Sequence, residues 1–222
     1  MTGRFQRAAP APDDLLPGAA GAGALGAMLV VVSGPSGVGK DTIIEALRAR
    51  SAAPTYDYVV TCTTRSPRPG EVDGVSYHFM DSERFAALRD AGAFLEWAEV
   101  HGNCYATPRV GVQRALAAGR DAILKVDVQG AASVKALVPE ALLVFVVPPS
   151  LESLFRRLRS RATETAEELE VRQRNAAIEL ARAGDYDHVV VNEEGLVERT
   201  ADQIDAIIHA ERAQHPDRRV VV

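Results

Sequence analysis

Residues 33–42 read SGPSGVGKDT and follow directly on the apolar, largely β-branched run 28–32. A short apolar run of this kind predicts a buried strand, and G-x-x-x-x-G-K between a strand and a helix is the pattern of a phosphate-binding loop. The glycines let the backbone curl so that successive N–H groups point at phosphate oxygens, and the helix N-terminus adds partial positive charge. We therefore expect a strand–loop–helix unit whose loop binds the phosphates of a nucleotide. The expected binding residues are Gly34, Pro35, Ser36, Gly37, Val38, Gly39 and Lys40.

The residue after Lys40 is Asp41, where such loops normally place a Ser or Thr whose hydroxyl ligates Mg²⁺. Two interpretations stay open. Asp41 holds Mg²⁺ through water, since hard cations accept carboxylate oxygens and keep several waters. Alternatively, it caps the first turn of the helix, where a carboxylate is favourable. Thr42 follows at once and offers a hydroxyl to the α-phosphate, so the site is retained in either case.

From residue 28 onward, apolar runs alternate with stretches of helical period, which predicts βαβ units. We expect an α/β fold with a three-layer α/β/α core, in which helices cover both faces of a parallel sheet. A chain of 222 residues with 47% hydrophobic content is large enough to bury such a core as one domain. The expected strands are 29–33, 58–62, 122–128, 142–147 and 187–191, and the expected helices are 41–50, 131–137 and 196–214.

Two stretches interrupt this alternation. Between residues 65 and 107, turn chemistry (SPRPGEVDG) accompanies short expected strands and one expected helix, which indicates a small inserted α+β lobe. The second stretch, RLRSRATETAEELE, is charged and poor in large apolar residues, and we interpret it as a mobile helical flap. The expected lobe strands are 77–80 and 94–101, and its helix is 82–91. The predicted division is core 28–62, 108–155 and 185–213, lobe 63–107, and lid 156–184.

The two ends and the bulk composition limit the remaining possibilities. Residues 1–27 are rich in Ala, Gly and Pro, so we expect them to be disordered, with Met28 as an alternative start, and we expect 214–222 to be a tail. The net charge of -5 argues against nucleic acid as a partner, and no apolar run approaches the ~18 residues of a membrane span. Cys62 and Cys104 match neither a metal spacing nor a disulfide framework, which favours a cytoplasmic protein.

Further blocks follow the glycine loop in a distinctive order: TTRSPRPGEVDGVSYHF, FLEWAEVHGNCYATP, KVDVQGA, PPS, RATET and VVVNEE. With these blocks, the sequence resembles the guanylate kinases over essentially all of residues 28–213. The most specific block is R-x-P-R-x-G-E followed by Tyr. The resemblance implies a P-loop NTPase core, a lobe that binds GMP and a lid that closes over ATP. It also implies ATP-dependent phosphorylation of GMP, and of dGMP, to GDP by direct in-line transfer, with Mg²⁺ as the cofactor.

The resemblance assigns GMP binding to Thr61, Arg65, Arg68, Glu71, Tyr77, Glu96, Tyr105, Thr107 and Asp127. Two guanidinium forks and two phenols suit a dianionic phosphate, which prefers charge-assisted bidentate donors. Glu96 would accept the N1–H and 2-amino donors of guanine, with Thr61 and Thr107 donating to O6. Without the family motif, the arginines would be solvated loop charges and Glu96 a carboxylate on an edge strand.

The resemblance assigns ATP binding to residues 34–42 with Arg157 and Asn192, and catalysis to Lys40, Arg161 and Arg172. Arg157 resembles an arginine that stacks on adenine, whereas Arg161 and Arg172 resemble those that meet the transferring phosphoryl group. Phosphoryl transfer needs positioning and cations more than covalent chemistry. Arg157 and Arg161 are four residues apart, so a shared helical face is expected. Mg²⁺ would be held mainly by phosphates and water, with Asp41 and Asp127 as candidate protein ligands.

Three departures from the family pattern concern Lys125, where many relatives carry an acidic residue, Ala106 in place of Gly, and Gln173 in place of an apolar residue. Rival hypotheses are an inactive scaffold relative that binds phosphopeptides and a kinase for another monophosphate. The retained glycine loop and lid arginines oppose the first, and Glu96 with its two threonines opposes the second. A dinucleotide-binding oxidoreductase is excluded because its fingerprint lacks the lysine. The oligomeric state stays open.

Overall fold

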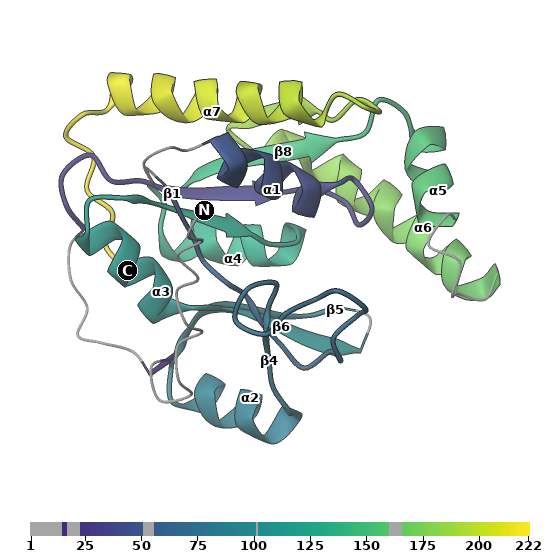
Figure 1. Cartoon of the computed structure of the whole chain (residues 1–222), viewed down its shortest axis with the longest axis horizontal. Coiled ribbons are helices and arrows are strands. Elements are labelled where there is room, and N and C mark those ends of the chain that lie inside the picture. The colour runs from purple at the N-terminus through teal and green to yellow at the C-terminus, as the bar shows by residue number, and fades with distance from the viewer. Residues whose placement is uncertain (1–14, 17–22, 51–55, 101, 160–165) are drawn as a thin grey trace, which may run out of the picture.

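The computed structural model describes residues 15–16, 23–50, 56–100, 102–159 and 166–222. Its centre is a five-stranded sheet in the order β2-β7-β1-β8-β9, in which each pairing is parallel (Figure 1). Because β1 is the central strand of this sheet, the glycine loop that follows it leaves from the middle of the sheet. The strands are β1 (Leu29–Ser33), β2 (Tyr56–Tyr58), β7 (Asp121–Lys125), β8 (Leu142–Val147) and β9 (His188–Val191).

Helices cover both faces of this sheet: in Figure 1 α7 lies above it and α3 and α4 lie below it, and α1, which overlaps β1 in this view, packs on the same face as α7. Side chains alternate between the two faces along a strand. Val30 and Val32 therefore pack against the helix layer that contains α1 and α7, the first layer, whereas Leu29 and Val31 pack against the layer that contains α3 and α4, the second layer. The first layer holds α1 (Lys40–Arg50), α5 (Leu151–Arg159), α6 (Ala166–Leu180) and α7 (Val197–Gln214). The second holds α3 (Arg109–Ala117) and α4 (Val128–Leu137), and a 3-10 turn, η2 (Ala181–Asp185), leads to β9.

A second sheet of four strands, in the order β4-β3-β6-β5, lies below the core in Figure 1. It pairs β3 with β4 in parallel, whereas β6 runs antiparallel to both β3 and β5. Its own small core joins Phe85 and Leu88 of α2 to Phe94 of the sheet. The elements are β3 (Cys62–Thr63), β4 (His78–Phe79), α2 (Ser82–Asp90), β5 (Phe94–Val100) and β6 (Asn103–Pro108).

The α/β class and the central parallel sheet predicted from the sequence are confirmed, but several element boundaries were wrong. The expected strand 58–62 is two strands, β2 in the core and β3 in the second sheet, because the chain crosses between the sheets at residues 59–61. The expected strand 122–128 ends at Lys125, since the Asp127 side chain caps α4. The flap expected at 157–170 contains the end of α5 and the start of α6, and β6 and α3 were not predicted.

The two ends of the described chain differ from their sequence-based description. The backbone N–H groups of Gly23 and Gly26 donate to Val220 O and Arg218 O at 2.9 Å and 3.0 Å. The N–H of Ala24 donates to Leu116 O at 2.9 Å, and Val220 is buried beside Leu116 in the α3–α4 layer. The expected disorder of 1–27 therefore does not extend to residues 23–27, and Val220 and Val222 of the expected C-terminal tail are buried in the core. Small residues permit this close packing, and their partners lie too far along the chain for local patterns to reveal.

Among the described residues, no helix combines the length and the apolar character that crossing a membrane requires.

Val220→Ala should lower the free energy of unfolding by about 2 kcal/mol, because it removes methyl groups from a fully buried side chain. Val221→Ala is the matched control, since the Val221 side chain is 57% exposed and its truncation should change stability by less than about 0.5 kcal/mol. Urea unfolding of both variants measures the difference. Equal effects would show that the C-terminal segment is not part of the core in solution.

Candidate active site

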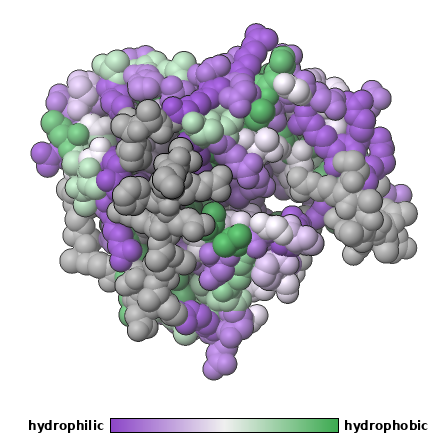
Figure 2. All heavy atoms as spheres, in the orientation of Figure 1, coloured by the Kyte–Doolittle hydropathy of each residue, from purple (hydrophilic) through white to green (hydrophobic). Residues whose placement is uncertain are grey.

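One pocket lies where the glycine loop of the core faces the second sheet. It draws side chains from β5, β7 and α6 as well as from the loop, so segments far apart in the sequence meet there. Figure 2 shows a hollow between the upper and lower parts of this face. The described residues that line the pocket include Gly34, Ser36, Gly37, Val38, Gly39, Lys40, Asp41, Thr42, Thr61, Arg68, Tyr77, Glu96, Tyr105, Lys125, Asp127, Arg172 and Glu179.

Hydrogen bonds from Asn192 and Arg157 hold the glycine loop in place. Asn192 Nδ2 and Arg157 NH1 donate to Val38 O at 2.7 Å and 3.1 Å. Asn192 is buried, and its Oδ1 accepts from Thr200 Oγ1 at 3.1 Å. Gly39 has φ 101°, and a Cβ there would approach Asn192 Nδ2 to 2.6 Å, so this position requires glycine. Neither Asn192 nor Arg157 is among the described residues that line the pocket, so both shape the loop instead.

Two charged side chains, Lys40 and Glu179, form hydrogen bonds with the backbone of the glycine loop. Lys40 Nζ donates to Gly34 O at 2.5 Å and to Pro35 O at 3.2 Å. Burial lowers the pKa of Lys40, although the carboxylates of Glu179 and Asp41 act in the opposite direction. Glu179 on α6 accepts from the Ser36 N–H at 3.2 Å, so a carboxylate lies where the loop amides would take an anion. Sequence reasoning missed Glu179, which lies in a helix without a motif of its own.

Glu96 is a buried carboxylate that projects from β5. Its Oε1 accepts a hydrogen bond from Thr107 Oγ1 at 2.6 Å across the β5–β6 pair. A Cβ on Gly130, near the start of α4, would lie 2.8 Å from Glu96 Oε2, so glycine is needed for this close approach. Burial raises the pKa of Glu96 to about 7, the Thr107 hydrogen bond opposes the shift, and the charge of Asp127 adds to it.

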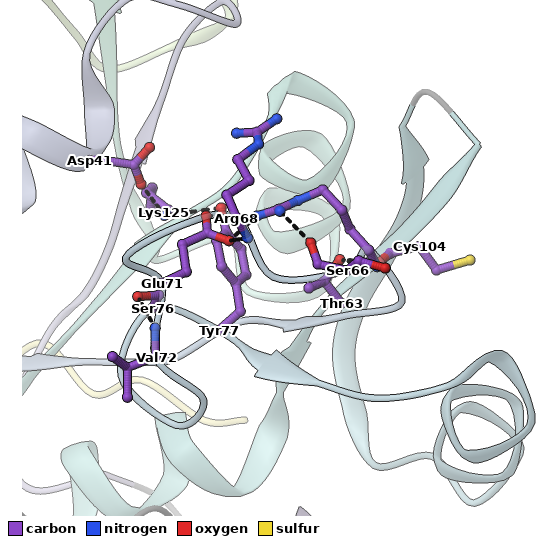
Figure 3. Close-up of polar contacts among 11 residues, drawn as sticks. Asp41, Thr63, Ser66, Arg68, Glu71, Val72, Ser76, Tyr77, Cys104 and Lys125 are labelled. Carbon is purple, nitrogen blue, oxygen red and sulfur yellow. Dashed lines mark hydrogen bonds and ion pairs between the residues drawn. The ribbon is translucent and has the colours of Figure 1, made fainter. Parts of the chain in front are cut away.

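The second sheet and its loops supply a cluster of arginine and tyrosine side chains (Figure 3). Both oxygens of Glu71 accept from Arg65 NH2, at 2.8 Å and 2.9 Å, and its Oε2 also accepts from the Arg68 N–H at 2.7 Å. The rings of Tyr77 and Tyr105 meet edge to face with centroids 6.1 Å apart. Arg68 and both tyrosines line the pocket, whereas Arg65 and Glu71 form a supporting ion pair beside them.

Asp41 forms an ion pair that neither sequence-based interpretation anticipated. It accepts from Lys125 Nζ, which also donates to the Tyr77 hydroxyl at 3.2 Å. Burial acts to lower the pKa of Lys125, but Asp41 and Tyr77 outweigh it, so this pKa lies above its ordinary value. Asp127 Oδ1 accepts from Gly130 N at 2.8 Å as the N-cap of α4. No group of three or more His, Cys, Asp or Glu side chains gathers as a metal site within the described ranges.

The remaining predicted residues divide between the pocket and its surroundings. Thr42, Thr61 and Arg172 line the pocket, the last from α6. Thr107 supports Glu96 from the neighbouring strand. Arg161 lies outside the described residues, so its expected helical face shared with Arg157 is not described either; α5 ends at Arg159.

A glycine loop at the centre of a parallel sheet, facing a second sheet with a buried carboxylate and an arginine–tyrosine cluster, defines a P-loop nucleoside monophosphate kinase. The sequence profile described as "Guanylate kinase" matches residues 26–211. A guanylate kinase of Chelativorans sp. is 44% identical over 86% of this chain and 86% of its own length. One of Mycobacterium tuberculosis is 48% identical over 81% of this chain and 86% of its own. The crystal structure of guanylate kinase from Anaplasma phagocytophilum has a TM-score of 0.69 and 33% identity, covering 86% of this chain and 89% of that one. The chain belongs to the guanylate kinase family.

The unusual pKa of Glu96 makes the stability of the protein depend on pH. The pKa is about 7 in the folded chain against an ordinary 4.5, so between these pH values the folded state holds the extra proton. The free energy of unfolding should therefore fall by ~3 kcal/mol through this group as the pH rises from 4.5 to 7.

Glu96→Gln removes this ionisation. Urea unfolding of both proteins between about pH 5 and pH 8 should show the wild type losing stability relative to the variant as the pH rises. Other titrating groups cancel in this difference. A constant difference across the range would contradict the burial of an ionisable Glu96.

Proposed function

We propose that this chain transfers the γ-phosphoryl group of ATP to GMP, and also to dGMP, by direct in-line transfer. The observation that carries the proposal is a buried carboxylate, Glu96, in the same pocket as the glycine loop. The family's ATP-dependent phosphorylation of GMP needs both a binding site for the triphosphate of ATP and a residue that recognises the guanine base. None of the contacts proposed below involves the ribose 2′-hydroxyl, which is why dGMP is included.

Guanine recognition rests on the donor pattern of its edge. The N1–H and the 2-amino group are adjacent donors, and the ionised Glu96 carboxylate accepts from both. Thr107 Oγ1 donates its one hydrogen to Glu96 Oε1 in this structure, so to join Thr61 as a donor to guanine O6 it exchanges that bond when Glu96 accepts the guanine donors. Adenine would present an unprotonated N1 to the carboxylate, leaving buried groups unpaired at roughly 1–3 kcal/mol each.

The acceptor phosphate is proposed to bind Arg68, Tyr77 and Tyr105 in the pocket, with Arg65 as a fourth donor that Glu71 orients. Charge-assisted donors of this kind suit a dianion. The attacking phosphate oxygen is already anionic, so the reaction requires no general base. In this proposal the lobe comprises residues 63–107, between core segments 28–62 and 108–155.

The donor triphosphate is proposed to occupy residues 34–42. When the triphosphate binds, Lys40 exchanges its hydrogen bonds to the loop carbonyls for hydrogen bonds to phosphate oxygens. The carboxylate of Glu179 moves away from the Ser36 N–H, and a phosphate oxygen takes its place. Arg172 on α6 and Arg161, both assigned to a lid of residues 156–184, supply cations where charge spreads in the transition state. Arg157 and Asn192 hold the loop in shape for this purpose.

The residues present fit a magnesium ion carried in by phosphates and water. Mg²⁺ keeps several waters and needs only one or two carboxylates, which agrees with the lack of a three-residue acidic cluster within the described ranges. Asp127, on the pocket wall, is the proposed protein contact, reached through water. When bound, the ion would neutralise charge on the transferring phosphoryl group.

A panel of nucleoside monophosphates with ATP and Mg²⁺, read by chromatography of the diphosphates, tests the proposed function. The wild type should convert GMP and dGMP with a preference over AMP of about 10⁴. Glu96→Gln should reduce that preference, whereas Glu99→Gln, at an exposed position of the same strand, should leave it unchanged. The absence of GDP, or equal use of AMP, would refute the proposal.

Arg172→Ala should lower kcat by about 10²–10³ with a much smaller change in KM for GMP, because its cation acts mainly on the transition state. Arg174→Ala, an exposed arginine on the same helix, is the control and should behave as the wild type. Steady-state kinetics with GMP varied at saturating ATP separate the two constants. Equal effects on kcat and KM would mean that Arg172 binds the ground state instead.

A further inference from the structure

Three pocket residues from separate elements form a continuous contact: Asp41 near the start of α1, Lys125 at the end of β7, and Tyr77 in the lobe just before β4 (Figure 3). Lys125 lies between the other two. Its Nζ donates to Asp41 Oδ1 and to the Tyr77 hydroxyl, the latter at 3.2 Å. The same Nζ lies 4.6 Å from the centroid of the Tyr77 ring. The glycine-loop helix is thus linked through one lysine to the acceptor-phosphate side.

The contact fixes how the Tyr77 hydroxyl is used. An ammonium group has no acceptor, so the phenol oxygen accepts from Lys125 and its own hydrogen must point elsewhere. Tyr77 and Lys125 both line the pocket, which leaves the hydroxyl as a donor toward the pocket contents. A neighbouring cation also polarises the O–H group and strengthens the hydrogen bond that it donates.

The other end of the contact explains the unusual residue after Lys40. The Lys125 side chain is only 20% exposed, whereas that of Asp41 is 67% exposed. The carboxylate therefore reaches in from the surface and pairs with the ammonium group of a mostly buried lysine side chain. An ammonium bonded to Asp41 also opposes the approach of a divalent cation to the same carboxylate.

On the basis of the proposed function, we infer that Lys125 is a positioning residue for the GMP phosphate, acting through Tyr77, and that Asp41 anchors Lys125 rather than ligating Mg²⁺. Lys125 orients the phenol before GMP arrives and makes it a better donor to the phosphate dianion. Asp41 and Lys125 thus act as one unit at two positions where the sequence departs from the family pattern.

Calorimetric titration of GMP without ATP and with EDTA tests this inference, because no metal-ligating role for Asp41 contributes under these conditions. Lys125→Met should raise the dissociation constant of GMP about tenfold, because the Tyr77 hydroxyl is then no longer held in place to donate to the phosphate. Asp41→Asn should raise it several-fold and should leave the fold intact, because the side chain is mostly exposed. Lys135→Met, which breaks the Lys135–Asp187 ion pair outside the pocket, should bind as the wild type does.

A double-mutant cycle with Tyr77→Phe separates action through Tyr77 from direct contact with the phosphate. Lys125→Met should add little to Tyr77→Phe, because the hydroxyl that Lys125 positions is already gone. Additive losses, or unchanged GMP affinity in Lys125→Met and Asp41→Asn, would overturn the inference while leaving the proposed function intact. Failure of the wild type to bind GMP would overturn both.

The Mg²⁺ concentration for half-maximal rate completes the test. It should be the same in the wild type and in Asp41→Asn once GMP is saturating. A raised Mg²⁺ requirement with unchanged GMP affinity in Asp41→Asn would restore Asp41 as a metal ligand and overturn the inference.

Discussion

Burial of β1 on both faces fixes the position of the glycine loop, and the rest of the site is built around that position. The strand pairs with β7 on one side and β8 on the other, so the loop leaves the sheet at its centre. The loop cannot satisfy its backbone alone, and Val38 O accepts from Asn192 and Arg157 behind it. These contacts fix the backbone of the loop at Val38, and preorganisation of this kind is what phosphoryl transfer requires.

A second constraint opposes stability. Glu96 is buried beside the Thr107 hydroxyl, and burial raises its pKa to about 7 because a buried carboxylate is poorly solvated. A poorly solvated carboxylate gains more from hydrogen-bond donors than a solvated one does, so the burial that lowers stability also favours recognition of a donor edge. Such a trade between stability and recognition is common at sites built on buried hydrogen bonds.

The glycine loop and the α/β class were predictable because a strand, a glycine pattern and a helix are local in sequence. The split between β2 and β3 was not, since Val59 and Val60 continue the apolar run through the crossover between sheets. The candidate site follows the same rule. Many of the motif residues line the pocket, whereas Arg157 and Asn192 contact the glycine loop from outside it. Lys125, which pairs with Asp41, lies 84 residues away, and Glu179 meets the loop only through the packing of α6. The packing of residues 23–27 could not be predicted from the sequence either, because a segment rich in Ala and Gly shows no periodic pattern of large hydrophobic residues.

The hydrogen bonds of Gly23 and Gly26 to Val220 and Arg218 bring the segment before β1 and the C-terminal segment together beside α3. Because a short linker would join these two segments, a circularly permuted protein that starts in an exposed turn elsewhere is feasible. Its sheets and helices would keep their neighbours while their order along the chain changed. The architecture therefore depends on which elements touch, and not on which of them is synthesised first.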